Sequence, residues 1–398
     1  MDIAVGLPKL SRRGFLKYGS LSGAAAFLAS CLSSNAPQTG ASPGATTAVG
    51  GTTGGTRAET ITWKFQSAFS PQDIFHEMLT DWAKKVDELT AGRLKIDALP
   101  NNAVAPFGQI VDAVSSGTLD GGLGVPAYWF GKHRALSLFG TGPSLGMDAD
   151  MTIGWVYYGG GQALYDELLQ KTLNLNVQSL FFGPMPTQPL GWFKDKPITS
   201  ADQLRGLKYR TVGLSADLFT ELGASVQILA GGDIVPALQT GRIDAAEFNN
   251  PTSDKLLGFQ DVAKVLMVQS YHQPGEFLEM LFNKPKYDAL PADLKAIVKY
   301  SIMAQSADFV WKFMDRNSKD YADFKAKGVQ IVKTPQSVLQ AQLDAWTKII
   351  DREQAKSDTG PTFKKILDSQ KAWAQRVGVL RAEVMVNNEL ATNHYFKK

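Results

Sequence analysis

Few side chains in this sequence are arranged for catalysis. Its 398 residues include one cysteine and four histidines, and no histidine is tied to a nucleophile by its spacing. No G-x-S-x-G, H-E-x-x-H, phosphate-loop or G-x-G-x-x-G pattern stands before a predicted helix. These absences argue against an enzyme and favour a protein that binds its ligand without covalent chemistry. The histidines are His76, His133, His272 and His394.

Arg210 is the main candidate for binding an anion. It ends the segment LKYR at 207–210. A guanidinium group is a planar fork of donors that matches a carboxylate through two hydrogen bonds, which the point charge of a lysine cannot do. From its spacing alone, however, Arg210 could also be an exposed arginine on a strand.

A short phrase occurs twice, as IVDAVSSGTLDG at 110–121 and as IVPALQTGRIDA at 234–245. Each copy predicts a helix that stops at a glycine able to adopt the left-handed conformation, followed by a short strand. We interpret the copies as corresponding parts of two α/β lobes, although two ordinary helix–glycine–strand turns could be alike by chance. Only the second copy continues into further candidates for ligand contacts. These are Glu247, Phe248, Asn249 and Asn250, of which the asparagines could simply form a turn.

The elements that must position these residues follow from periodicity. Alternating apolar residues predict a strand at 60–69, helical spacing predicts a helix at 71–92 with Gly92 as its cap, and another strand follows at 93–99. Strand, helix and strand at this spacing form the unit of a largely parallel sheet.

Two later segments, 175–194 and 275–291, resemble long strands that carry the chain between lobes, so the ligand cleft is expected where they cross. From 292 onward the pattern is helical, most clearly at 343–357 and 363–386. The fold class is therefore α/β with a long helical C-terminal region. A long terminal helix of this kind would brace both lobes or contact a second subunit.

The N-terminus predicts export. Paired arginines in SRRGFLK (11–17) precede an apolar run at 21–30 that is too short to span a bilayer. The pattern resembles a twin-arginine signal, and Cys31 in LASC resembles the acylated cysteine of a lipobox. Residues 32–57 are almost all small or polar, typical of a flexible tether. The alternatives are an amphipathic first helix and an ordinary buried cysteine.

The net charge of +3 is carried entirely by the first 30 residues, and the remaining chain is balanced. A neutral body without a basic run argues against nucleic-acid binding.

One segment carries a family resemblance. GWFKDKPITSADQLRGLKYRTVG, at 191–213, resembles the signature region of the extracytoplasmic solute-binding proteins of TRAP transporters, of the DctP type. The segments GGGQALYDEL, GGDIVPALQTGRIDAAE and KYDALPADLKAIV are similar to the branch that binds 2-oxo and 2-hydroxy carboxylates. The resemblance covers about residues 60–330. It implies a two-lobed periplasmic-binding-protein-like fold with the ligand cleft between the lobes.

The resemblance also implies roles for single residues. Arg210 would bind the ligand carboxylate, and Gln188 would contact both the ligand and a Na⁺ or Ca²⁺ ion bound with it; no other cofactor is implied. Glu247 would be an acidic ligand of that cation. Phe248, where relatives often have Trp, would contribute its main-chain carbonyl. Gln273 lies where some relatives place an acid, and its neutral amide weakens the case for a cation. Asn249, Tyr128 and Trp129 complete the expected set, the two aromatic residues as an opposing wall, although aromatic residues more often belong to a core.

We therefore expect an exported, membrane-anchored lipoprotein that presents a small organic acid to TRAP membrane subunits, with a homodimer formed through its C-terminal helices. The alternatives are the receptor of an ATP-driven importer and an exported α/β enzyme. The expected organisation is a signal at 1–31, a tether at 32–58, lobe I at 59–185, lobe II at 186–275, and a return strand with bracing helices at 276–398.

Overall fold

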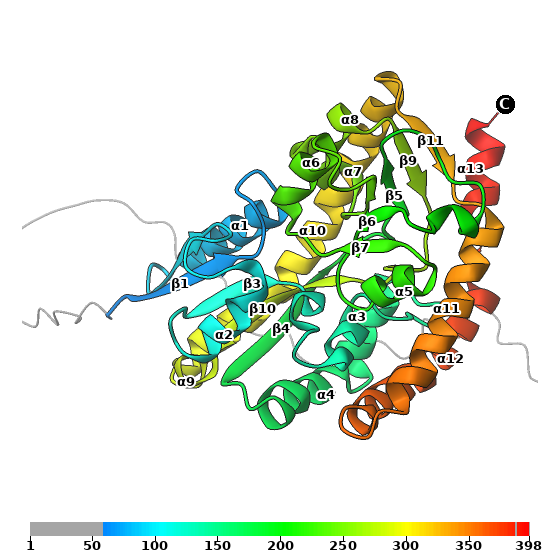
Figure 1. The fold of residues 1–398 in the computed structure, drawn as a ribbon. Coiled ribbons are helices and arrows are strands. Elements are labelled where there is room, and N and C mark those ends of the chain that lie inside the picture. Colours follow the sequence, from blue (N-terminus) through cyan, green and yellow to red (C-terminus); the bar gives the residue numbers. More distant parts are fainter. Residues whose placement is uncertain (1–58, 387, 398) are drawn as a thin grey trace, which may run out of the picture. The chain divides into compact units, whose positions relative to one another are not determined.

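Two β-sheets carry the fold, and each combines strands from distant parts of the sequence (Figure 1). The computed structural model describes residues 59–386 and 388–397, so the predicted signal, Cys31 and the predicted tether lie outside the described residues. Sheet A has the order β2-β1-β3-β10-β4, and sheet B has the order β11-β9-β5-β8-β6-β7. No helix in the described part is long and apolar enough to cross a membrane.

The strands of sheet A are β1 (Ile61–Ser67), β2 (Leu94–Leu99), β3 (Gly121–Gly124), β4 (Val177–Pro184) and β10 (Phe277–Asn283). The strands of sheet B are β5 (Gly191–Phe193), β6 (Lys208–Arg210), β7 (Ser225–Gln227), β8 (Ala245–Ala246), β9 (Val265–Val268) and β11 (Gln330–Lys333).

The longer helices are α1 (Ile74–Leu89), α3 (Ala149–Tyr158), α6 (Gly231–Gln239), α10 (Ala292–Ala326), α11 (Gln336–Gln354), α12 (Gly360–Val384) and α13 (Asn388–Phe396). The shorter ones are α2 (Ile110–Ser115), α4 (Gly161–Glu167), α5 (Ser215–Glu221), α7 (Pro251–Leu257), α8 (Phe259–Val262) and α9 (Lys284–Asp288). Short 3₁₀ helices lie at Phe107–Gln109, Pro126–Trp129, Arg134–Phe139 and Ala201–Leu204, and a π-helical turn lies at Leu168–Thr172.

The predicted strand–helix–strand unit at the start of the fold is confirmed. β1 and β2 pair in parallel, and α1 connects them. Asp73 caps α1 by accepting a hydrogen bond from the Phe75 N–H, and the chain leaves the helix through Gly92, whose φ is +79°. The apolar face of α1 is buried, so burial of that face holds the helix on the sheet.

The two copies of the repeated phrase occupy matching positions. The first forms α2 and then β3, which pairs in parallel with β1; the second forms α6 and then β8, which pairs in parallel with β6. The glycines that end the helices, Gly117 and Gly241, both have a positive φ, of +81° and +71°. Asp120 accepts a hydrogen bond from the main-chain N–H of Lys64, and Asp244 does the same for Lys208. The shared aspartate is therefore a structural clamp between neighbouring strands.

The two segments predicted as long strands are interrupted. In the first, β4 ends at Pro184 and β5 begins only at Gly191; in the second, β10 is followed directly by α9. The prediction of unbroken strands was wrong because residues 185–190 pass from one sheet to the other in the first segment, and the chain forms α9 directly after Asn283 in the second. Residues 269–276, before β10, also pass between the sheets. Two main-chain hydrogen bonds join these crossing segments. The Met185 N–H donates to the Glu276 carbonyl (2.9 Å), and the Gln188 N–H donates to the Gln273 carbonyl (3.3 Å).

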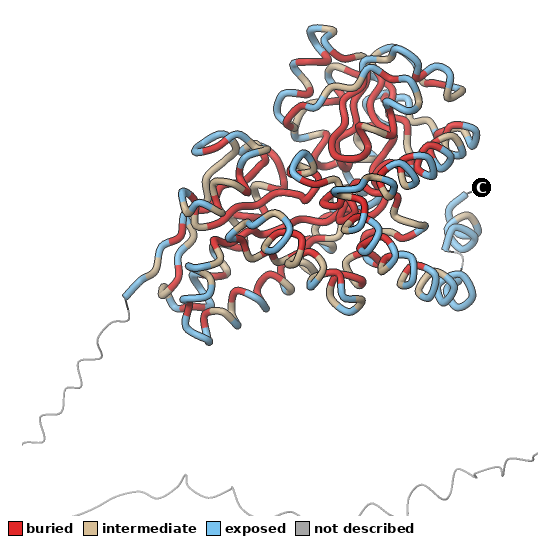
Figure 2. Tube along the Cα trace, turned by 60° about the horizontal axis from the view of Figure 1, so that its bottom comes forward, coloured by how far each residue is buried: buried red, intermediate tan, exposed pale blue. Residues whose placement is uncertain are grey.

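The C-terminal helices connect the elements around both sheets. The 35-residue helix α10 packs on α1 and β4 and also on α7. α11 packs on α5, whereas α12 packs on α3 and α4. Figure 2 shows that the sheets are largely buried, while the far part of α12 and all of α13 are mostly exposed. These helices therefore form the predicted long helical region.

Candidate functional site

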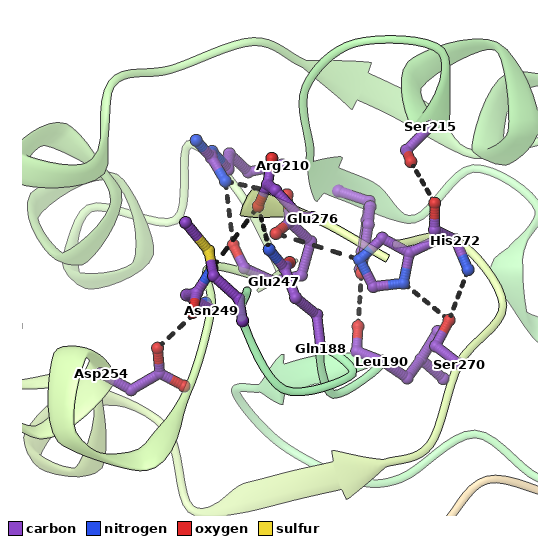
Figure 3. A network of polar contacts seen from close by, with 12 residues as sticks. Gln188, Leu190, Arg210, Ser215, Glu247, Asn249, Asp254, Ser270, His272 and Glu276 are labelled. Atoms are coloured by element: carbon purple, nitrogen blue, oxygen red, sulfur yellow. Dashed lines mark hydrogen bonds and ion pairs between the residues drawn. The ribbon is translucent and has the colours of Figure 1, made fainter. Parts of the chain in front are cut away.

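Arg210 lies at the end of β6 and is only 1% exposed. Its Nη1 donates to Glu247 Oε1 (2.8 Å) and to the Glu247 carbonyl (3.1 Å), while Nε and Nη2 donate to the Leu229 carbonyl. The parallel pairing of β6 with β8 places Arg210 beside Ala246, so the next residue, Glu247, also lies close to Arg210. The alternative of an exposed strand arginine was wrong. Figure 3 shows the side chains of Arg210 and Glu247.

The second oxygen of Glu247 is not satisfied by this pair. Oε2 has no hydrogen-bond partner among the described residues and lies 3.9 Å from His272 Nε2, which also has none. The other ring nitrogen of His272 lies 2.7 Å from Ser270 Oγ. His272 is fully buried and comes from the second crossing segment, which brings it to the ion pair.

Glu276 is a site residue that the sequence analysis missed. Its Oε2 accepts hydrogen bonds from Gln188 Nε2 (2.8 Å) and, at 3.5 Å, from Asn249 Nδ2. Burial, and after it the nearby charge of Glu247, raise the pKa of Glu276 to about 8. A signal was present: EFLEMLF at 276–282 predicts a fully buried strand, and a glutamate at its start needs a polar partner.

These residues surround a small internal cavity. Its volume is about 10 Å³, close to the smallest space that can hold one water molecule. Its polar lining comes from Arg210, Asn249, Gln273, Glu276 and Tyr128, and Phe248 and Met185 are among its apolar lining residues. Sheet A elements, sheet B elements and both crossing segments therefore meet at one point. The cavity lies at the predicted crossing.

The remaining predicted residues do not line the cavity. Gln188 and Glu247 do not line the cavity but hydrogen-bond to Glu276 and Arg210, which do. Trp129 was expected in the wall, and this was wrong: its indole donates to Glu279 Oε2 (2.9 Å) inside the core of sheet A. Asn250 has a structural role, because its side chain caps α7 by accepting from the Ser253 N–H.

The oxygen atoms around the cavity fit a hard cation. Four buried side-chain oxygens, on Gln188, Glu247, Gln273 and Glu276, have no hydrogen-bond partner in the described part of the chain. Carboxylate and amide oxygens are the ligands that Ca²⁺ prefers. No group of three or more His, Cys, Asp and Glu side chains within residues 59–386 and 388–397 could hold a metal ion. The unpartnered amide and carboxylate oxygens therefore suit a hard cation that shares its coordination with a ligand.

The chain is similar to known proteins over most of its length. Residues 65–357 match the family model described as bacterial extracellular solute-binding protein, family 7 (DctP). A monocarboxylate 2-oxoacid-binding periplasmic protein from Nostoc is 32% identical over 295 residues, which cover 74% of this chain and 79% of that protein.

Solved structures of TRAP solute-binding proteins are similar to this chain in fold. A TRAP transporter solute-binding protein from Bordetella bronchiseptica, a dimer with calcium and picolinate, has a TM-score of 0.78 and 28% identity, covering 85% of this chain and 97% of its own. TRAP solute-binding proteins from Colwellia psychrerythraea, with calcium and pyruvate, and from Pseudoalteromonas atlantica, with sodium and pyruvate, both have a TM-score of 0.77 and 28% identity. Each covers 85% of this chain and 100% of its own.

Proposed function

Because the chain belongs to family 7 of the bacterial extracellular solute-binding proteins, the DctP receptors of TRAP transport, we propose that it captures a small 2-oxo or 2-hydroxy monocarboxylate outside the cytoplasm. It then presents this acid to TRAP membrane subunits. The observation that carries the proposal is a buried arginine fork that shares one small cavity with Gln273 and Glu276 of the second crossing segment and with Asn249, which follows β8. Family membership favours this reading over an ATP-driven importer or an enzyme.

Arg210 binds the ligand carboxylate in this proposal. Four of the five guanidinium N–H groups already have protein acceptors, two on the Leu229 carbonyl and two on Glu247. A bidentate carboxylate therefore has to take the place of Glu247 Oε1 on Nη1. The two contacts to Leu229 keep the fork oriented during this exchange. Asn249 offers an amide N–H to the 2-oxo or 2-hydroxy oxygen.

Glu247, released from Arg210, becomes available to a cation. The unpartnered oxygens of Gln188, Gln273 and Glu276 and the main-chain carbonyl of Phe248 complete the proposed ligands. Glu276 supplies the second carboxylate that the neutral Gln273 does not. These residues would hold Na⁺ or Ca²⁺, which would supply positive charge to the oxygens of the acid; no other cofactor is required. The calcium- and sodium-containing pyruvate complexes of the similar proteins support this choice.

Binding is coupled to closure of two lobes. We assign lobe I to 59–185 and lobe II to 186–275, with 276–398 returning one strand to each sheet and bracing both lobes. A cavity of about 10 Å³ cannot admit an organic acid while the lobes stay in place, so the ligand enters an open form and stabilises the closed one. No covalent step is needed, and the protein is not an enzyme.

Export and assembly complete the proposal. The segment 1–31 is a twin-arginine lipoprotein signal that ends at Cys31, and 32–58 is the tether to the membrane lipid. A homodimer forms through the C-terminal helices, where several large apolar side chains are exposed. They are Val379, Leu380, Val384, Met385 and Val386, with exposed fractions from 52% to 81%.

Calorimetric titration tests the proposed ligand class. Pyruvate and lactate, each with Ca²⁺ or Na⁺, are titrated into the protein alongside succinate and glucose as controls. We expect stoichiometric binding of a monocarboxylate and no consumption of it over hours. Binding of none of the monocarboxylates, or their turnover, contradicts the proposal.

A further inference from the structure

Met185 separates the central cavity from a much larger groove. Among the described residues it is the one side chain that lines both spaces, and it is 3% exposed. The cavity measures about 10 Å³, whereas the groove measures about 420 Å³. The groove lies between the start of α3, the crossing segment after β4, and residues 310–317 of α10.

The side chain of Met185 is held weakly, while its backbone is held firmly. Its Sδ atom accepts from Asn249 Nδ2 at 2.9 Å, and a thioether is a weak acceptor. Its main-chain N–H donates to the Glu276 carbonyl at 2.9 Å. Methionine is also the most adaptable of the large apolar residues, because it is unbranched. The side chain can therefore turn aside without moving the crossing segment, and this frees the Asn249 amide for a ligand.

The neighbouring aromatic wall is less adaptable. Phe75 lines the cavity and Phe313 lines the groove, and their rings pack edge to face at 5.9 Å. Phe309 packs on both rings. A ligand that outgrows the cavity therefore has an easier path past Met185 than through this cluster.

We propose that the groove is a subsite for the apolar tail of the ligand, and that Met185 is a movable partition that sets the accepted chain length. The inference rests on the proposed function: the carboxylate and the 2-oxo group stay at Arg210 and Asn249, and the tail passes Met185. The ligand class then extends from pyruvate to 2-oxo monocarboxylates with apolar tails of three or four carbons.

The chemistry of the groove selects an apolar tail. Its lining includes Pro184, Pro186, Val310, Phe313 and Met314. Asp148 and Asp150 also contribute, and Asp148 is already paired with Arg381. Asp150 forms no ion pair among the described residues, and its negative charge opposes a second carboxylate at the end of the tail. Dicarboxylic 2-oxo acids are therefore excluded from this subsite.

The test compares three acids by calorimetric titration: pyruvate, 4-methyl-2-oxopentanoate and 2-oxoglutarate. The protein is used as wild type, Met185→Ala, Met185→Phe and Met151→Ala. Met151 is a buried methionine on α3 that lines neither space and serves as the matched control. Thermal melts without ligand establish that each variant is folded.

We expect the wild type to bind pyruvate and 4-methyl-2-oxopentanoate but not 2-oxoglutarate. Met185→Ala shifts the affinity ratio towards the branched acid by about tenfold, and Met185→Phe shifts it towards pyruvate by a similar factor, as is usual for one or two methylene groups in an apolar pocket. Met151→Ala leaves the ratio unchanged. A ratio that stays within threefold in both Met185 variants overturns the inference while the proposed function stands. A wild type that binds no 2-oxo acid overturns both.

Discussion

Arg210 and Glu247 form an ion pair at 2.8 Å in which neither side chain is more than 1% exposed. The pair joins the ends of two parallel strands, and the guanidinium also ties in the Leu229 carbonyl. Burial of both charges costs desolvation free energy, which their mutual contact and these hydrogen bonds offset. Arg210 therefore has a structural role in addition to its proposed role in binding.

Arg210→Ala should lower both stability and affinity. Removing one partner of a buried pair typically costs about 3–5 kcal/mol of folding free energy, because the other charge is left alone. Denaturant unfolding measures this loss, and the double variant Arg210→Ala/Glu247→Ala should recover part of it. Affinity for the acid should fall by about 30- to 4,000-fold.

Arg210→Lys separates the two roles. It keeps a positive charge near Glu247 but loses the fork, so binding should weaken at least tenfold while the protein loses less stability than Arg210→Ala. Wild-type affinity in Arg210→Lys would exclude a bidentate carboxylate at this residue.

Variants of Glu276 and of its neighbour Glu279 test whether acid binding depends on a cation. Glu276→Gln removes a proposed ligand charge and should weaken the dependence of acid binding on added Ca²⁺ or Na⁺, measured by titration in chelated, sodium-free buffer with each ion returned. Glu279→Gln is the control, because Glu279 is also fully buried on this segment but bonds to Trp129 away from the cavity. Equal affinity of the wild type with and without ions would show that the acid binds without metal.

Stability should fall as the pH rises through neutrality. Burial raises the pKa of Glu279, Asp73 and Asp254 to about 7 each. The folded protein therefore keeps protons that the unfolded chain releases near pH 4, and the associated stability is complete below that pH and is lost as the pH approaches and passes 7.

Thermal and denaturant unfolding between pH 5 and pH 8.5 measures this effect. Glu279→Gln should flatten the curve by up to about 3 kcal/mol, which corresponds to a shift of two to three pKa units. A wild-type stability that rises steadily from pH 5 to pH 8.5 would contradict the assignment.

Gln342 of α11 should support the site from a distance. Its Oε1 accepts from the Tyr271 N–H (2.8 Å), and its Nε2 donates to Ser270 Oγ (2.9 Å), so it fixes the segment that carries His272 and Gln273. Gln342→Ala should weaken acid binding by about tenfold and cost about 1–3 kcal/mol of stability. The exposed Gln340 on the same helix provides the control, Gln340→Ala. If both variants bind like the wild type, α11 has no part in organising the site.

Anchoring depends on Cys31. Cys31→Ser should move the protein from the membrane fraction to the free exported fraction, because the acyl chain holds it to the bilayer. Fractionation and immunoblotting measure the distribution. Retention of the variant in the membrane fraction at the wild-type level would rule out the lipoprotein assignment.

The sequence by itself determined the local elements and the family. Alternation and helical spacing predicted the first strand–helix–strand unit, and the repeated phrase predicted two matching helix–glycine–strand turns, whose aspartates clamp neighbouring strands in both sheets. These features depend on contacts between residues close in sequence, or on a periodicity that the burial of one face imposes. Arg210 could be singled out because its chemistry and its family segment agree.

Only the tertiary structure decided which charges meet. The register of β6 on β8 brings Arg210 to Glu247, and the contact between the two crossing segments brings Glu276 to Gln188. The same packing takes Trp129 out of the expected wall, because Glu279 of the neighbouring strand provides a buried partner for its indole. These contacts join residues 37, 88 and 150 positions apart, so local sequence patterns do not predict them. They are fixed by strand order and by the need to satisfy buried polar groups, which exists only once the chain has packed.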